Sequence, residues 1–128
     1  MNIGKVAELS GVPAKTIRYY ESIGLTLPPA RSESGYRTYA EEDVHMLKFV
    51  ARARSLGFSI DDCRGLLALY RDRGRASADV KRIAEEHIGE IERKITELQS
   101  MRTVLRRLAE KCHGDDRPDC PILDELSG

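Results

Sequence analysis

The sequence predicts a mainly α-helical chain, in which a small N-terminal domain precedes one long helix and a short cysteine-containing tail. Three observations support this prediction. Apolar residues recur at helical spacing through most of residues 1–75, with a proline- and glycine-containing interruption at residues 25–39. Residues 78–110 contain no proline and only one glycine. Two cysteines with seven residues between them then fall in an acidic segment.

The first 24 residues predict two short helices joined by a tight turn. Apolar residues mostly share one face of a helix over residues 3–10, and Gly11 is a natural stop. Pro13 suits the first turn of a second helix, which ends at Gly24 and buries Ile17. Two short helices with a glycine-containing turn between them predict a helix-turn-helix.

A β-hairpin and two further helices are predicted next. Prolines and the Ser-Glu-Ser-Gly cluster separate two short segments within residues 25–39, which is typical of a hairpin, or wing. One helix follows from about Glu41 to Leu56, with acidic residues in its first turn. Another runs from a capping box at Ser59 to about Tyr70. We therefore expect a winged helix-turn-helix domain over residues 1–75.

Residues 76–110 predict a dimerisation helix. A helix of roughly 30 residues is about 45 Å long, too long to bury an apolar stripe against a domain of 75 residues. We expect it to form an antiparallel coiled coil with its copy in a second chain. A parallel pairing and a helix folded back on its own domain are the alternatives. The stripe has spacings of four and three, with one step of seven across Arg102, and consists of Ala84, Ile88, Ile91, Ile95, Leu98 and Leu105.

Length and composition narrow the function classes. The chain has 128 residues, enough for a modest core but not for a large substrate cavity. An enzyme is not expected, because no nucleophile–base pair, phosphate-binding glycine loop or open three-ligand metal site is present. No apolar run is long enough to span a bilayer, so we expect a cytoplasmic protein without membrane contact. The net charge of zero combines a mildly basic N-terminal part with an acidic tail.

Basic and aromatic residues of the N-terminal domain are candidate DNA contacts. Arg and Lys neutralise phosphates or bind guanine edges, and Tyr hydroxyls bind phosphates. Taken singly, each residue also fits the solvated surface of a helical domain. The turn, the wing and the dimerising helix together favour DNA binding. The candidates are Lys15, Arg18, Tyr19, Tyr20, Arg31, Tyr36, Arg37, Tyr39 and Arg54.

The tail, residues 111–128, is a candidate metal-binding loop followed by a short helix from Pro121. Cys112 and Cys120 could bind one soft metal ion, form a disulfide, or do neither. Two thiolates alone suit a monovalent d¹⁰ ion such as Cu(I), whereas zinc prefers four donors. His113 is a further candidate ligand. Cys63 lies in a helical stretch, where a small buried apolar residue is the expected role.

Three strings, TIRYYESIGL, PPARSESGYRTY and DVHMLKFVARARSLGFSIDD, resemble the MerR family of winged helix-turn-helix transcriptional regulators. The resemblance runs from Asn2 to about Tyr70 and through the predicted dimerisation helix. It implies a homodimer on double-stranded promoter DNA, with the second helix in the major groove and the wing on the flanking backbone. It also implies that effector binding distorts the promoter spacer, so that RNA polymerase can use the promoter.

The tail resembles the copper-responsive, CueR-type branch of that family through its two cysteines and the strings ADVKR and ELQSMR. Where regulators of divalent zinc, lead or mercury have a third Cys, this chain has Ser77. The resemblance thus implies Cu(I) as effector, with Ag(I) or Au(I) also possible, and activation of copper efflux genes. Ser77 also fits a helix N-cap. A thiol/disulfide redox regulator, a divalent-metal sensor and a copper chaperone are the alternatives.

Overall fold

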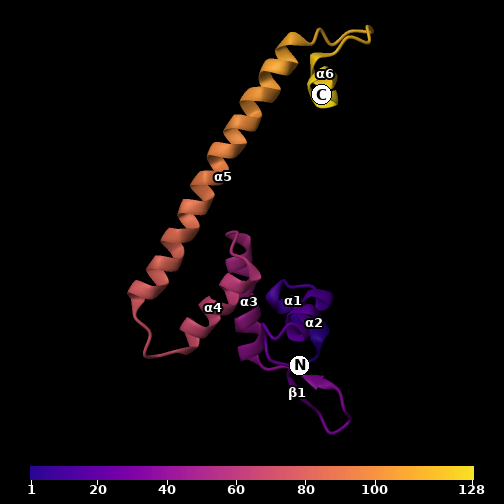
Figure 1. Ribbon diagram of the computed structural model, residues 1–128. Coiled ribbons are helices and arrows are strands. Elements are labelled where there is room, and N and C mark those ends of the chain that lie inside the picture. The colour runs from indigo at the N-terminus through magenta and orange to yellow at the C-terminus, as the bar shows by residue number, and fades with distance from the viewer. The chain divides into compact units, whose positions relative to one another are not determined.

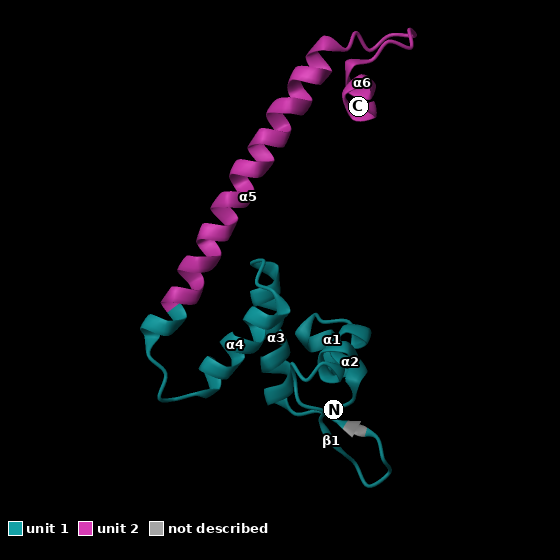
Figure 2. Ribbon diagram, in the orientation of Figure 1, with its two compact units in different colours: residues 1–80 teal, residues 81–128 magenta. Residues whose placement is uncertain are grey.

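The computed structural model describes residues 1–128, except for the side chain of Arg37, and confirms a mainly helical chain with a two-stranded wing (Figure 1). The chain divides into two compact units, residues 1–80 and 81–128 (Figure 2). The elements in chain order are α1 (Ile3–Ser10), α2 (Ala14–Ser22), β1 (Ala30–Arg31), β2 (Arg37–Thr38), α3 (Glu41–Ser55), α4 (Ile60–Arg71), α5 (Ser77–Lys111) and α6 (Pro121–Ser127).

The helix-turn-helix forms as the sequence predicts. The side chain of Asn2 accepts a hydrogen bond from the Lys5 backbone N–H and caps α1. Gly11 ends this helix in the left-handed region, with φ of +74°, and its N–H donates to the Ala7 carbonyl. Pro13 precedes α2, which ends at Ser22, slightly earlier than predicted.

One small core joins four helices of the first unit. Its most deeply buried side chains are Val6 of α1, Ile17 of α2, Val50 of α3, and Cys63 and Leu67 of α4. The burial of Ile17 and Cys63 agrees with the sequence prediction. Because each helix contributes an apolar residue to the same cluster, the orientation of α2 depends on α1, α3 and α4.

The wing is a short antiparallel ribbon. Ala30 pairs with Thr38 and Arg31 with Arg37. The Ser32 N–H donates to the Tyr36 carbonyl at 2.7 Å, which closes the loop. After β2, the Tyr39 N–H donates to the Met1 carbonyl, and the Met1 ammonium donates to the Tyr39 carbonyl, both at 2.8 Å. The chain's first residue is therefore bound to the exit of the wing.

Side-chain caps define the beginnings of α3 and α4. The Asp43 carboxylate accepts from the Ala40 N–H at 2.8 Å. Ser59 Oγ accepts from the Asp62 N–H at 3.0 Å, and the Asp62 carboxylate accepts from the Ser59 N–H at 3.3 Å. The predicted capping box at Ser59 is therefore present.

The long helix α5 has 35 residues, which corresponds to a length of about 52 Å at 1.5 Å per residue. Ser77 is its first helical residue, and the Ala76 carbonyl accepts from the Asp79 N–H. The helix thus begins one residue earlier than an N-cap role for Ser77 requires. None of the helices that the structure describes combines the length and hydrophobicity of a bilayer span.

Candidate nucleic-acid interface and metal site

The helical period separates an exposed face of α2, which carries candidate DNA contacts, from its buried face. Lys15, Arg18 and Tyr19 are exposed, and the side chain of Tyr19 is 53% accessible. Ile17 and Tyr20, three residues apart, point into the core, and Tyr20 is only 7% accessible. Tyr20 therefore differs from the other candidate DNA contacts on this helix, because its ring packs inside the domain.

The wing and the first two helices form one surface. A shallow hollow is lined by Asn2, Ile3, Arg18 and Tyr36, so Arg18 of α2 lies near Tyr36 of the wing loop. Tyr36 is 75% accessible, and Arg31 is also exposed. The predicted contact Arg37 lies outside the described side chains. The hollow therefore joins a basic and an aromatic candidate from two elements, and both side-chain types can bind DNA phosphates.

Arg54 is exposed near the end of α3 and already has a structural partner. Its Nη1 donates to the Phe58 carbonyl at 2.8 Å. A guanidinium carries five N–H donors, so this bond leaves donors available for a phosphate. Arg54 can therefore serve both the turn before α4 and a DNA contact.

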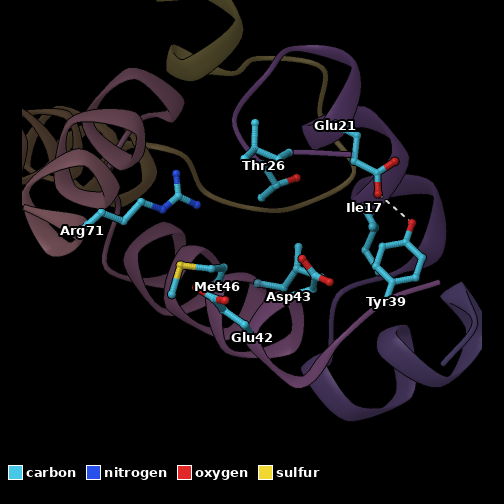
Figure 3. Close-up of a pocket in the computed structure, with 10 residues that line it drawn as sticks. Ile17, Glu21, Thr26, Tyr39, Glu42, Asp43, Met46 and Arg71 are labelled. Carbon is cyan, nitrogen blue, oxygen red and sulfur yellow. Dashed lines mark hydrogen bonds between the residues drawn. The ribbon is translucent and has the colours of Figure 1, made fainter. Parts of the chain in front are cut away.

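Tyr39 occupies a buried position that its sequence context did not predict. Its side chain is 4% accessible, and its hydroxyl donates to Glu21 Oε1 of α2 at 2.6 Å (Figure 3). Both residues line a cavity of about 240 Å³ that extends between α2 and α3. Tyr39 thus connects the exit of the wing to α2 from inside the domain, unlike the exposed DNA-contact candidates. No local pattern could reveal this bond, because its partners are 18 residues apart.

The two tail cysteines are brought together by the ends of two helices. Cys112 directly follows α5, and its N–H donates to the Leu108 and Ala109 carbonyls, both at 3.2 Å. Cys120 directly precedes α6, and its carbonyl accepts from the Asp124 N–H. Both thiols are free and partly buried, and their Sγ atoms are 3.8 Å apart. This separation is far longer than a disulfide bond of about 2.05 Å.

The beginning of α6 favours the thiolate form of Cys120. Hydrogen bonds from the backbone N–H groups of Leu123 and Ile122, together with the Cys112 thiol, lower the pKa of the Cys120 thiol. Partial desolvation and the Asp124 carboxylate oppose this shift. A thiolate is the form in which a cysteine can bind a metal ion or react as a nucleophile.

The side chains between the cysteines do not complete a larger metal site. Asp115 accepts from Arg117 through the backbone N–H and Nε, each at 2.9 Å, and its Oδ2 lies 2.8 Å from Arg117 Nη2. These bonds lower the pKa of the Asp115 carboxyl. His113 is exposed. Among the side chains that the structure describes, no three His, Cys, Asp or Glu residues are grouped to hold a metal ion.

The sulfur separation suits a bridging ion. With metal–sulfur bonds of about 2.3 Å, a linear unit needs sulfurs about 4.6 Å apart, and a tetrahedral unit needs about 3.8 Å. The observed 3.8 Å is therefore within about 1 Å of both arrangements. The number of donors, and not the sulfur distance, distinguishes the two geometries. Each chain offers two sulfur donors at this place.

Comparisons with known proteins identify related transcriptional regulators. A family profile described as "MerR HTH family regulatory protein" matches residues 1–70, and one described as "MerR, DNA binding" matches residues 44–108. "Heavy metal-dependent transcription regulator 2" of Rhizobium meliloti (strain 1021) is 60% identical over 127 residues, which cover 99% of this chain and 86% of that protein. "HTH-type transcriptional regulator CueR" of Salmonella typhimurium is 52% identical over 128 residues, which cover 100% of this chain and 93% of that protein.

A solved structure shows the same fold over nearly the whole chain. The transcription regulator PbrR691 from Ralstonia metallidurans CH34, in complex with lead(II), is 32% identical to this chain. The TM-score is 0.85, and the match covers 98% of each chain.

Proposed function

The chain belongs to the MerR family of helix-turn-helix transcriptional regulators, and from that premise we propose that it is a metal-responsive regulator whose effector is Cu(I). As a family member it is a DNA-binding regulator and not an enzyme. Ag(I) and Au(I) have the same charge and a similar preference for thiolates, so they would act at the same site. The observation that carries the proposal is the pair of partly buried thiols, Cys112 and Cys120, 3.8 Å apart.

The donor set favours a monovalent ion. Zinc prefers four tetrahedral donors, whereas Cu(I) accepts two soft thiolates. Two thiolates with one monovalent ion carry a net charge of −1. The N–H groups of Leu123 and Ile122, which already lower the pKa of Cys120, would stabilise that charge.

The apolar stripe of α5 supports a homodimer. Ile88, Ile91, Ile95, Leu98 and Leu105 are 40–60% accessible in the single chain. Such a continuous stripe on a helix about 52 Å long is suited to pairing with the same stripe of a second copy. The proposed coiled coil would shield these side chains from water.

An antiparallel pairing would bring each Ser77 to a metal site. The stripe extends from Ala84 to Leu105, so its midpoint lies between residues 94 and 95. Residues 77 and 112 are equally far from this midpoint. In an antiparallel dimer centred there, the partner subunit's Ser77 would lie opposite Cys112. A hydroxyl at this place does not supply the third thiolate that a divalent ion would favour.

Promoter DNA would be bound by the exposed candidates on α2 and the wing. Lys15, Arg18 and Tyr19 would enter the major groove, while Arg31 and Tyr36 would hold the flanking backbone. In the proposed mechanism, the metal-bound dimer deforms the promoter spacer so that RNA polymerase can transcribe copper efflux genes. The deformation costs a few kcal/mol, which the metal-bound dimer would have to offset by binding the deformed DNA more tightly, so DNA would in turn raise the affinity for the metal.

A redox switch is the second candidate function. The two sulfurs are near enough to bond after a small movement, and the lowered pKa of Cys120 favours thiolate attack. Such a step would convert two thiols into a disulfide, with two protons and two electrons passing to an oxidant such as a peroxide. It would require no metal.

A promoter-reporter assay separates the two functions. Cu(I) should induce the wild-type chain and the Cys63→Ala control, but neither Cys112→Ser nor Cys120→Ser. Retained Cu(I) induction in either single serine variant would contradict the two-thiolate proposal. Induction by peroxide under strict copper chelation would favour the redox switch.

A further inference from the structure

Arg64 of α4 makes two hydrogen bonds to the chain that directly follows α2. Its Nη1 donates to the Gly24 carbonyl and its Nη2 to the Ile23 carbonyl, both at 3.0 Å. The contacts join residues 40 and 41 positions apart in the sequence. One guanidinium therefore holds two successive carbonyls at the C-terminal end of the helix-turn-helix.

The chemistry of a helix end explains why this contact can orient α2. The last carbonyls of a helix have no partners within the helix and carry its partial negative charge. Ile23 is the C-cap of α2, so Arg64 satisfies its open carbonyl and also binds the Gly24 carbonyl that follows, which places a positive charge at the negative end of the helix. Because its two terminal nitrogens are fixed in one plane, bonding to both carbonyls restrains direction as well as distance.

The Arg64 hydrogen bonds connect α4 to the helix that carries the candidate DNA contacts. Lys15, Arg18 and Tyr19 project from α2, whose C-terminal end is held by Arg64. From α4 the chain continues through residues 72–76 into α5. A rotation of α4 would therefore pull directly on the end of α2.

We propose that Arg64 is a positioning residue, which sets the tilt of α2 on DNA and couples that tilt to α4. It acts through the carbonyls of Ile23 and Gly24 and does not bind phosphate itself. The inference rests on the proposed function in taking promoter DNA as the ligand of α2, and its transcription readout also takes Cu(I) as the effector. It assigns a role to a residue outside the predicted DNA-binding set.

The test compares full-length Arg64→Met, Arg64→Lys and the control Arg71→Met, which removes the same charge from the end of α4. Affinity is measured over a salt series for a duplex that the wild-type chain selects from a random-sequence pool.

We expect Arg64→Met to bind this duplex about threefold to tenfold more weakly than the wild-type chain, as the loss of a charged hydrogen-bonded contact implies. Arg64→Lys should recover only part of the loss, since one ammonium cannot hold both carbonyls in a plane. Arg71→Met should bind within about twofold of wild type.

The salt dependence distinguishes positioning from direct contact. If Arg64 bound a phosphate, its replacement by Met would make the negative slope of log affinity against log salt about 0.9 less steep. If Arg64 only positions α2, the slope in Arg64→Met equals that of the wild-type chain. All variants are measured at least 15 °C below their unfolding midpoints, so an affinity loss reports orientation and not unfolding. If Arg64→Met is unfolded at the assay temperature, the folded Arg64→Lys variant tests the inference instead. A DNA affinity of Arg64→Lys equal to that of the wild-type chain would then overturn it.

Two further results would overturn it: wild-type affinity in folded Arg64→Met, or a slope reduced by about one, which would make Arg64 a phosphate contact. A transcription assay adds an independent readout. Folded Arg64→Met should show a smaller ratio of Cu(I)-induced to uninduced transcription than wild type, which a purely stabilising role would not produce. Failure of the wild-type chain to select any duplex would instead contradict the proposed DNA-binding function.

Discussion

The Sγ atoms of Cys112 and Cys120 lie 3.8 Å apart, although seven residues separate them in the sequence. The end of α5 positions one sulfur and the beginning of α6 positions the other. The loop between them is folded by the Asp115–Arg117 contacts. The fold therefore holds the two thiols close together, which would reduce the entropy cost of binding one ion between them.

Removing the Asp115–Arg117 contact should weaken metal binding without abolishing it. We expect Asp115→Asn to lower Cu(I) affinity by less than about fivefold, because the contact is exposed and only prepares the loop. The control Asp116→Asn removes the same charge from the neighbouring residue. A competition titration with a chelator of known Cu(I) affinity measures both variants. Equal affinity in the two variants would exclude a role for the Asp115–Arg117 contact.

The three cysteines should differ in reactivity towards an alkylating reagent. Cys63 is fully buried, and desolvation raises the pKa of its thiol, whereas Cys112 and Cys120 are partly accessible. Mass spectrometry after iodoacetamide treatment at pH 8 should show two modified thiols in the folded chain and three in urea. Rapid modification of Cys63 in the folded chain would contradict its burial.

Cys63 should also make stability depend on alkaline pH. A raised pKa in the folded state means that the folded chain retains the proton longer than the unfolded chain. Its contribution is therefore fully present below the ordinary value of 9.0 and is lost as pH rises towards the raised folded value. The wild-type chain should lose more unfolding free energy than Cys63→Ala between pH 8 and pH 10. Urea titrations at the two pH values provide the measurement, and equal losses would contradict the shift.

The hydrogen bond from Tyr39 to Glu21 should stabilise the first unit. Tyr39→Phe removes the hydroxyl from a buried carboxylate and should cost about 1–3 kcal/mol of unfolding free energy. Urea unfolding of Tyr39→Phe, Glu21→Gln and the double variant forms a double-mutant cycle. Strictly additive effects of the two substitutions would show that the 2.6 Å bond contributes nothing to stability.

The sequence predicted the elements better than the inward or outward direction of individual side chains. Gly11, Pro13 and the Ser59 capping box act locally, so they located helix ends correctly. Tyr20 and Tyr39 look like nearby DNA candidates in the sequence, yet both are buried. Tyr20 could have been recognised from its three-residue spacing to Ile17. The partner of Tyr39 could not, because that bond depends on tertiary packing.

The contact made by Arg64 is also tertiary, so the sequence did not predict it. Arginine on an exposed helix face has no local sequence signal for carbonyls 40 residues away. The cysteine loop was more predictable, because Pro121 marks the start of α6 directly after Cys120. The sequence therefore singled out both cysteines as candidate donors, while their 3.8 Å separation required the structure.

A charge in the middle of the α5 stripe should prevent dimer formation. Ile95 lies beside the midpoint of the stripe, so Ile95→Glu would place two carboxylates near each other in an antiparallel pair. The control Lys94→Glu changes an exposed neighbour outside the stripe. Light scattering after size-exclusion chromatography should show a dimer for wild type and the control, and a monomer for Ile95→Glu. A dimeric Ile95→Glu would place the interface elsewhere.

We propose that one monovalent ion is held by two sulfur atoms in each chain. X-ray absorption at the copper edge, on protein loaded anaerobically with one Cu(I) per chain, tests it most directly. The proposed site predicts two sulfur neighbours per copper and no third donor, with loading lost in Cys112→Ser and in Cys120→Ser. Three or four donors around the bound ion would contradict the claim and favour a divalent-metal sensor.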